Sequence, residues 1–168
     1  EHMKDLDMKD FVGSPKLVKC GAFKNFLLDL SSLIPKNYID EFNLKMIFIR
    51  YSLSILLATR DYVNSCDLSD FSRNYKLLTI HEKIKHIKTS KRLIPLTDKA
   101  LLYIDEFIEL KEKYKIDFSY PILLKEEDSE ISLVQLTKTS VLEYLKSFKE
   151  DYKYFEIEKF IKITELNL

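Results

Sequence analysis

Glycine and proline are scarce in this chain, and their scarcity limits the folds that it can adopt. The 168 residues contain 2 glycines and 4 prolines. Sandwiches and barrels need many tight turns, so this composition favours helices over all-β architectures. Neither a GxGxxG fingerprint nor a P-loop can be written with so few glycines, which excludes phosphate-binding loops of both kinds.

Cysteines and long apolar runs are also few. Cys20 and Cys66 lack metal-ligand spacing, and two cysteines are too few for a disulfide framework at this length. The most apolar run, around residues 46–58, is too short and too charged at its flanks to span a membrane. No signal peptide is visible, so we expect a reduced, cytoplasmic and nucleoid-associated protein.

The remaining composition predicts a globular protein with a real core. Hydrophobic residues make up 46% of the chain and charged residues 32%, which is not the composition of a disordered segment. Glu1-His2-Met3 resembles a cloning remnant, and residues 1–14 read as a leader. We expect residues 15–168 to form one domain.

Charge is balanced overall but unevenly distributed along the chain. Lys+Arg and Asp+Glu both total 27. Residues 72–92 contain seven Lys/Arg and one acid, a net of +6, whereas residues 105–168 contain ten Lys and fifteen acids, a net of −5. A basic patch on a neutral protein indicates a local site for an anionic partner.

Hydrophobic periodicity predicts an α+β, mostly helical fold. Residues 40–58 are apolar nearly all round, so we expect a buried central helix in which Arg50 reaches the surface or pairs with an acid. Strands at residues 75–82 and 91–96 should form an antiparallel hairpin, or part of a three-stranded sheet, with residues 83–90 as its tip.

Helices are expected on both sides of this hairpin. Apolar spacing predicts helices at residues 22–33 and 98–114, the second capped by Thr97. A short strand or loop at 118–124 and an acidic turn at 126–128 follow. Ser140 and Glu143 have capping-box spacing at the start of a further helix, and residues 152–168 form the last segment.

Arg60 is the first candidate functional residue. It follows the buried helix, where a cation commonly binds the last carbonyls and needs no further role. The functional alternative is a rigidly held guanidinium that binds two phosphoryl oxygens at once and keeps its charge.

Lys83 is the second candidate, at the end of the first hairpin strand. Taken alone, a turn lysine is usually a solvated charge. In phosphoryl transfer it could instead protonate the leaving oxygen as a general acid. Further cations of the hairpin would contact phosphates and so position DNA without reading its sequence. These DNA-binding candidates are Lys85, His86, Lys88, Lys91 and Arg92.

Other chemistries find little support in the sequence. His81 and His86 have no carboxylate or cysteine at ligand spacing, so we expect no metal site. The chain contains no G-x-S-x-G motif, and none of its ten tyrosines follows a His-x-x-Arg.

In order, these segments resemble the tyrosine recombinases, the phage-integrase family. Four segments carry the resemblance: Leu56-Leu57-Ala58-Thr59-Arg60, Asp67-Leu68-Ser69-Asp70-Phe71, Leu77-Leu78-Thr79-Ile80-His81-Glu82-Lys83 and Lys91-Arg92-Leu93-Ile94-Pro95-Leu96. Their order and separations are similar to the family's, including the 23 positions between Arg60 and Lys83. The close match covers about residues 45–110. The family usually has a glycine before the arginine and an acid three residues after it, where this chain has Thr59 and Val63.

The resemblance implies site-specific DNA recombination or integration without metal or cofactor. A tyrosine would attack the scissile phosphate, Arg60 would be the first catalytic arginine and Lys83 the general acid. The family's His-x-x-Arg box, later His or Trp and tyrosine nucleophile are missing from this sequence. We therefore expect part of a catalytic domain that binds double-stranded DNA, does not cleave it alone, and self-associates on DNA in the full-length protein.

Two alternatives remain open. One is a non-catalytic helical DNA-binding module in which Arg60 caps a helix and the hairpin binds phosphates. The other is an interaction protein whose acidic C-terminal half faces a basic partner.

Overall fold

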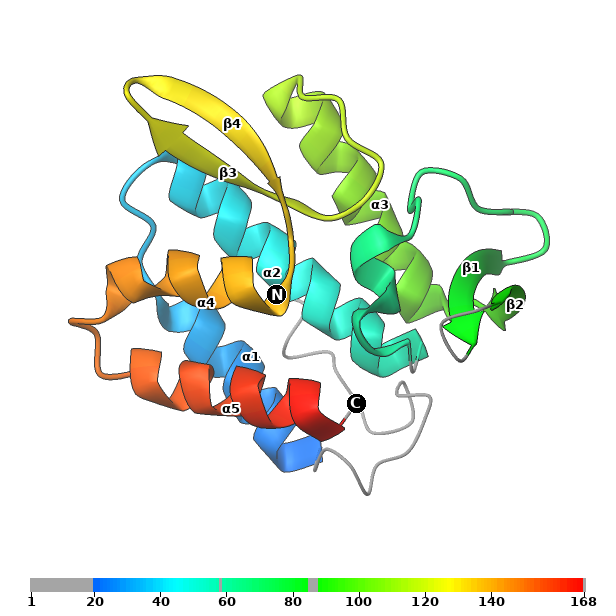
Figure 1. Ribbon diagram of the computed structural model, residues 1–168, viewed down its shortest axis with the longest axis horizontal. Helices are drawn as coiled ribbons and strands as arrows, with labels where there is room; N and C mark the ends of the chain where they lie inside the picture. The colour runs from blue at the N-terminus through cyan, green and yellow to red at the C-terminus, as the bar shows by residue number, and fades with distance from the viewer. Residues whose placement is uncertain (1–19, 58, 85–87, 168) are drawn as a thin grey trace.

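The chain folds into a helical body with two β-hairpins (Figure 1). The computed structural model describes residues 20–57, 59–84 and 88–167. In chain order the elements are α1 (Cys20–Ser32), α2 (Tyr38–Leu57), the 3-10 helix η3 (Arg60–Ser65), β1 (Leu77–Ile84), β2 (Lys88–Pro95), α3 (Asp98–Tyr114), β3 (Ile122–Glu127), β4 (Glu130–Gln135), α4 (Lys138–Leu145), the 3-10 helix η4 (Lys146–Phe148) and α5 (Tyr154–Asn167).

Helix α2 is the centre of the body, as its all-round apolar pattern predicts. Apolar side chains such as Phe42, Ile47, Leu53 and Leu56 are completely buried along its length. Helices α1 and α3, strand β3 and η3 all pack against it. A helix enclosed in this way is stabilised by apolar burial on several sides at once, so it can serve as a rigid support for its neighbours.

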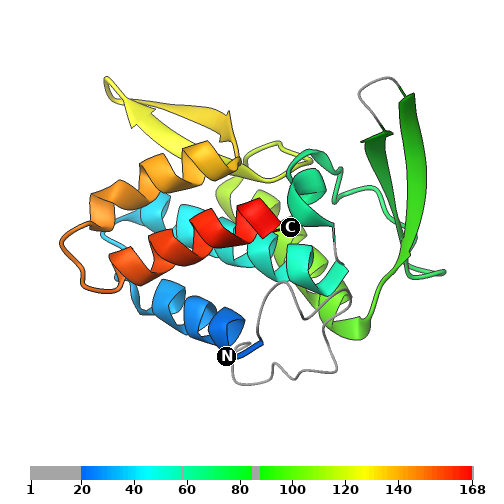
Figure 2. The same cartoon turned by 60° about the horizontal axis from the view of Figure 1, so that its bottom comes forward.

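Helix α5 returns across α1 and closes the body (Figure 2). The rings of Phe26 in α1 and Phe160 in α5 stack with their centroids 4.3 Å apart. Phe26 also meets the edge of Tyr51 in α2 at 5.3 Å, so one ring links three helices. No helix among the described residues has the length and apolar character needed to cross a membrane.

The boundaries of α3 confirm the predicted cap. The Thr97 hydroxyl accepts a hydrogen bond from the Ala100 N–H at 3.1 Å, and the helix ends at Tyr114. Lys115 then adopts a left-handed conformation with φ 54° and donates its N–H to the Lys111 carbonyl. A local cap sets the ends of this helix, and its regular apolar stripe packs against α2.

Several predicted boundaries in the C-terminal half are wrong. Glu126 lies in β3, and the turn is formed by Asp128 and Ser129, which both have positive φ and lead into an unpredicted strand, β4. Thr137, not Ser140, caps α4: its hydroxyl accepts the Ser140 backbone N–H, and its own backbone N–H donates to the Ser140 hydroxyl oxygen. The sheets are two separate antiparallel pairs, β1–β2 and β3–β4.

Candidate nucleic-acid interface

Arg60 lies just beyond the end of the buried helix. Helix α2 stops at Leu57 with no basic residue in its last turn, and Arg60 is the first residue of η3. Its backbone therefore belongs to η3. Its side chain lies outside what the structure describes, so both interpretations of Arg60 stay predictions.

Asn64 fixes η3 to the rest of the body. Its side-chain oxygen accepts a hydrogen bond from Arg50 Nε in α2 at 2.6 Å, and its backbone carbonyl accepts one from Gln135 Nε2 at 3.3 Å. Val63 of the same short helix is completely buried. These contacts with α2, β4 and the core give the backbone at Arg60 a defined location.

The position of Arg50 contradicts the expectation that it reaches the surface. Only 1% of this residue is exposed, so it does not reach the surface. Its guanidinium lies over the ring of Tyr51, 4.2 Å from the centroid, and bonds to Asn64. Burying a charged group costs free energy unless hydrogen bonds and ring contacts replace water. Arg50 therefore couples the central helix to η3.

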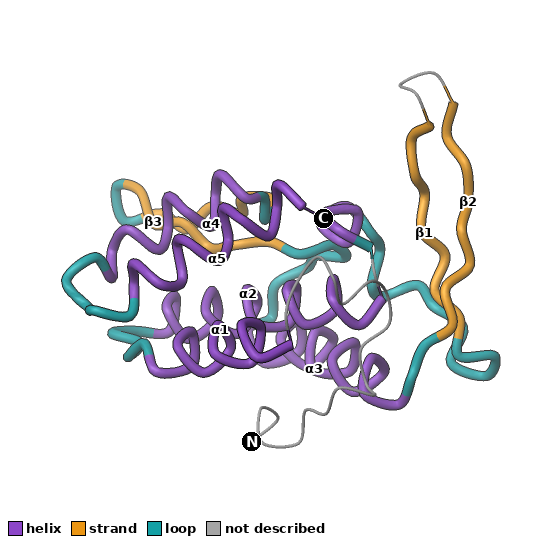
Figure 3. The backbone as a smooth tube through the Cα atoms, turned by 90° about the horizontal axis from the view of Figure 1, so that it is seen from below, coloured by secondary structure: helices purple, strands orange, loops and turns teal. Residues whose placement is uncertain are grey.

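The β1–β2 hairpin projects from one end of the helical body (Figure 3). Its base is anchored by Leu78, Ile80 and Ile94, which are buried in the core. The ladder continues outward to the pairs Lys83↔Thr89 and Ile84↔Lys88. The strands therefore extend well into the predicted tip, and Lys83 and Lys88 belong to the ladder. Lys85 and His86 lie outside the described residues.

The other two hairpin candidates are exposed on β2. Lys91 pairs with His81 and Arg92 with Ile80, and neighbouring residues of a strand face opposite sides. Lys91 and Arg92 are therefore presented on the two faces of the ribbon. By the same alternation, position 83 lies on the face of Lys91.

A cavity of about 690 Å³ separates this face of the ribbon from the segment after η3. Lys91, Thr79 and Leu93 line it from the hairpin, and Asp67 and Asp70 line it from the loop. The Asp67 carboxylate accepts the Ser69 N–H at 3.0 Å, which shapes the loop around the opening. Ser65 also lines the cavity, so the C-terminal end of η3 lies beside the ribbon.

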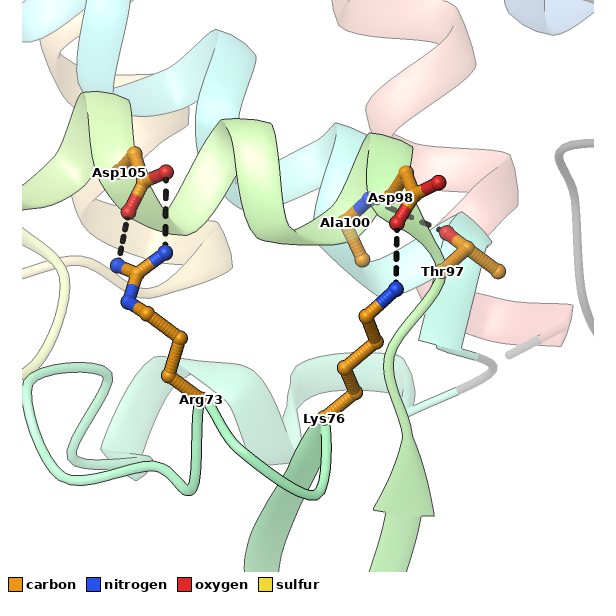
Figure 4. Close-up of polar contacts among 6 residues, drawn as sticks. All are labelled: Arg73, Lys76, Thr97, Asp98, Ala100 and Asp105. Atoms are coloured by element: carbon orange, nitrogen blue, oxygen red, sulfur yellow. Dashed lines mark hydrogen bonds and ion pairs between the residues drawn. The ribbon is translucent and has the colours of Figure 1, made fainter.

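Two ion pairs tie the hairpin's entry to α3 (Figure 4). Arg73 binds Asp105 with both terminal nitrogens of its guanidinium, and Lys76 Nζ lies 2.9 Å from an oxygen of Asp98. The hydrogen bond to Asp105 raises the pKa of Arg73. The guanidinium also lies over the Phe71 ring, 5.1 Å from its centroid. Two of the seven cations counted in the basic segment are thus already engaged with carboxylates.

Cys66 lines the cavity, and its thiol is unreactive. Burial and the neighbouring charge of Asp67 raise the pKa of its thiol to about 12. Its sulfur is 3.8 Å from the Thr79 carbonyl, toward which the thiol can donate. A thiol with so high a pKa is almost wholly protonated at neutral pH and is a poor nucleophile.

Sequence reasoning missed the residues that position the hairpin. Asp98 and Asp105 are seven residues apart, so they lie on one side of α3, and this spacing was a usable signal. Asn64 gave no such signal, because its partners Arg50 and Gln135 are distant in sequence.

Comparisons with known proteins provide no identification. No protein-family model, curated protein or solved structure matches the chain. In the described ranges, no group of three or more His, Cys, Asp or Glu side chains is placed to hold a metal ion. What the arrangement offers chemically is a set of cations on a projecting ribbon, beside a short helix that begins with an arginine. Such a set suits a phosphodiester backbone.

Proposed function

We propose that this chain is part of a tyrosine-recombinase catalytic domain and that it binds double-stranded DNA. One observation supports the proposal: Ser65, the last residue of η3, and Lys91 of the β1–β2 ribbon line the same cavity, and η3 precedes the ribbon in the chain order of that family. The ribbon projects from the body, so a duplex can approach it without displacing a helix (Figure 3).

In the proposed reaction each residue has a separate role. A tyrosine hydroxyl gives its proton to a general base as its oxygen attacks the scissile phosphorus, and the bond to the 5′-oxygen breaks as a 3′-phosphotyrosyl link forms. Arg60 neutralises charge on the phosphoryl oxygens, and Lys83 gives a proton to the departing 5′-oxygen. The second arginine and the nucleophile would come from outside this sequence.

Salt-dependent DNA binding tests the first part of the proposal. We expect fluorescence anisotropy with a labelled duplex to show affinity falling steeply as salt rises, because bound phosphates release counterions. Lys91→Ala/Arg92→Ala should flatten the log–log slope by about 2. The matched control, Lys149→Ala/Lys159→Ala, removes two exposed lysines from the C-terminal region and should leave the slope unchanged. Salt-independent binding, or equal slopes for both variants, would overturn the proposal.

Strand cleavage by the intact recombinase tests the second part. Arg60→Ala should lower the cleavage rate by roughly 10²-fold or more, because a preorganised donor to the transition state is lost. Arg60→Lys keeps the positive charge but loses the bidentate guanidinium. Its cleavage rate should lie between those of the wild type and Arg60→Ala. Cleavage at the wild-type rate in Arg60→Ala would exclude a catalytic role for this arginine.

The acidic half of the molecule supports a second candidate function, the binding of a basic protein partner. Glu126, Glu127, Asp128 and Glu130 cluster at the exposed end of the β3–β4 hairpin. An interaction protein would use this cluster to capture a basic partner. Binding of such a partner by a chain that shows no affinity for DNA would favour that function over recombination.

A further inference from the structure

Each hairpin has one edge that is closed by the rest of the chain. On β3, the Asn43 amide donates to the Leu124 carbonyl at 2.9 Å, and its oxygen accepts the Leu124 N–H at 2.7 Å. On β1, the Leu77 N–H and carbonyl both pair with Ser72, and the Thr79 carbonyl faces Cys66. These contacts close the edge of β3 at Leu124 and the edge of β1 near its base.

The second strand of the acidic hairpin has an open edge. Leu136 donates its N–H to the Pro121 carbonyl, which fixes the alternation of bonded and non-bonded pairs along the ladder. Ile131 and Leu133 then occupy non-bonded pairs, so their backbone N–H and C=O groups point away from β3. Among the described residues, β3 is the only strand that pairs with β4.

The second strand of the basic hairpin is open in the same way. Leu96 donates its N–H to the Lys76 carbonyl, so the same alternation directs the backbone groups of Lys91 and Leu93 away from β1. Within the described ranges, β1 is the only strand neighbour of β2.

Both open edges carry exposed apolar side chains. Leu93 on β2 is 62% exposed, and Ile131 and Leu133 on β4 are 38% and 48% exposed. Natural sheets usually protect such edges with charges, bulges or a covering segment, and an uncovered apolar edge is a template for a further strand.

The two edges have opposite charge and lie apart in one molecule. Exposed Lys91 and Arg92 belong to β2, whereas Glu126 and Glu130 flank the exposed face of β4. The hairpins emerge from opposite ends of the helical body (Figure 3). One copy therefore cannot pair its own two edges with each other, so each edge would need another molecule.

We infer that a second copy of this chain is the partner of these edges, with β2 of one molecule pairing with β4 of the other. Leu93 would pack with Ile131 and Leu133, while the cations of β2 lie near the acids of β3–β4. Complementary charge steers the encounter and selects the unlike hairpin, because like hairpins repel. The association needs no DNA.

Charge reversal tests the pairing between unlike hairpins. In sedimentation velocity at low salt, we expect the wild-type protein to associate with rising concentration and to dissociate at high salt. Glu126→Lys/Glu130→Lys alone, and Lys91→Glu/Arg92→Glu alone, should each lower the association constant by roughly tenfold or more. An equimolar mixture of the two variants should associate again, because basic β2 meets acidic β4 once more. Glu150→Lys/Glu156→Lys changes the net charge equally on exposed residues elsewhere and should behave as wild type.

A proline substitution tests the strand geometry separately. Leu133→Pro removes a backbone donor that faces outward and leaves the β3–β4 ladder bonds in place, so it should lower association without unfolding the hairpin. Leu133→Val keeps both the donor and the apolar surface and should associate normally. Circular dichroism reports whether each variant is folded, and the charge variants do not depend on this substitution.

Two results would overturn the inference. One is a wild-type protein that stays monomeric at low salt and high concentration. The other is association that survives both charge reversals. Because these measurements contain no DNA, a protein that stays monomeric would leave the proposed recombinase function untouched. Lys91 and Arg92 take part in both proposals, so Glu126→Lys/Glu130→Lys, which leaves them in place, is the variant that separates association from DNA binding.

Discussion

The two hairpins share an antiparallel ladder but are attached to the helical body in different ways. In β3–β4, Ile122, Leu123 and Leu124 are all buried, and the Asn43 side chain pairs with the backbone at Leu124. In β1–β2, the residues whose burial is described include the buried Leu78, Ile80 and Ile94 at the base, and ion pairs on the surface hold the entry. Both hairpins contribute to the core. β3–β4 is held there by a buried side-chain amide, whereas the entry to β1–β2 is held by exposed ion pairs, which cost less to break.

The largest expected effect breaks the attachment of β3–β4. Asn43→Ala should lower the free energy of unfolding by about 3 kcal/mol, since the buried N–H and C=O of Leu124 both lose their partner. Urea denaturation measures the change. Asn25→Ala, at an exposed position in α1, is the matched control and should change stability by less than about 0.5 kcal/mol. Equal effects would show that the amide does not hold the hairpin.

A smaller and opposite effect is expected at the β3–β4 turn. Ser129 has φ 68°, a conformation that a side chain disfavours and glycine accepts. Ser129→Gly should raise the free energy of unfolding by about 0.5 kcal/mol, measured by the same denaturation. Ser132→Gly within β4 should instead lower it, because glycine weakens a strand interior. Two changes of the same sign would contradict the strain at Ser129.

The smallest effect on global stability concerns the other hairpin. Arg73→Ala/Lys76→Ala removes exposed ion pairs, so global unfolding should hardly change. Hydrogen exchange of the β1 and β2 amides should nevertheless become several-fold faster, and high salt should do the same to the wild type.

The control for this measurement is Lys125→Ala. It removes ion pairs of Lys125 with Glu127 and Glu143 and should not speed exchange in β3–β4, where Asn43 and the core retain the strands. Faster exchange there would erase the distinction between the two attachments.

The elements predicted best from sequence are those whose causes are local. Helix α3 begins after Thr97 and ends at Tyr114 because its cap and apolar stripe lie within the segment itself. The buried character of α2 follows equally from its own composition.

The elements predicted worst depend on partners far along the chain. Strand β4 shows little burial, and its ladder partner β3 is held by Asn43, which is 81 residues from Leu124. The burial of Arg50 depends on Asn64, whose position next to it no local pattern reveals. For the candidate site, the sequence identified the cations, while the ion pairs to Asp98 and Asp105 needed the folded arrangement of α3.

The junction at Asn64 has a consequence for how this protein can evolve. One asparagine serves a side chain from α2 and another from the end of β4, and it contacts them through different atoms. A replacement at position 64 that keeps the fold must supply a side-chain acceptor for Arg50 Nε. It must also keep the backbone carbonyl where Gln135 Nε2 can reach it. Positions 50 and 64 are therefore expected to drift as a pair, so variation at one should be tolerated only with a matching change at the other.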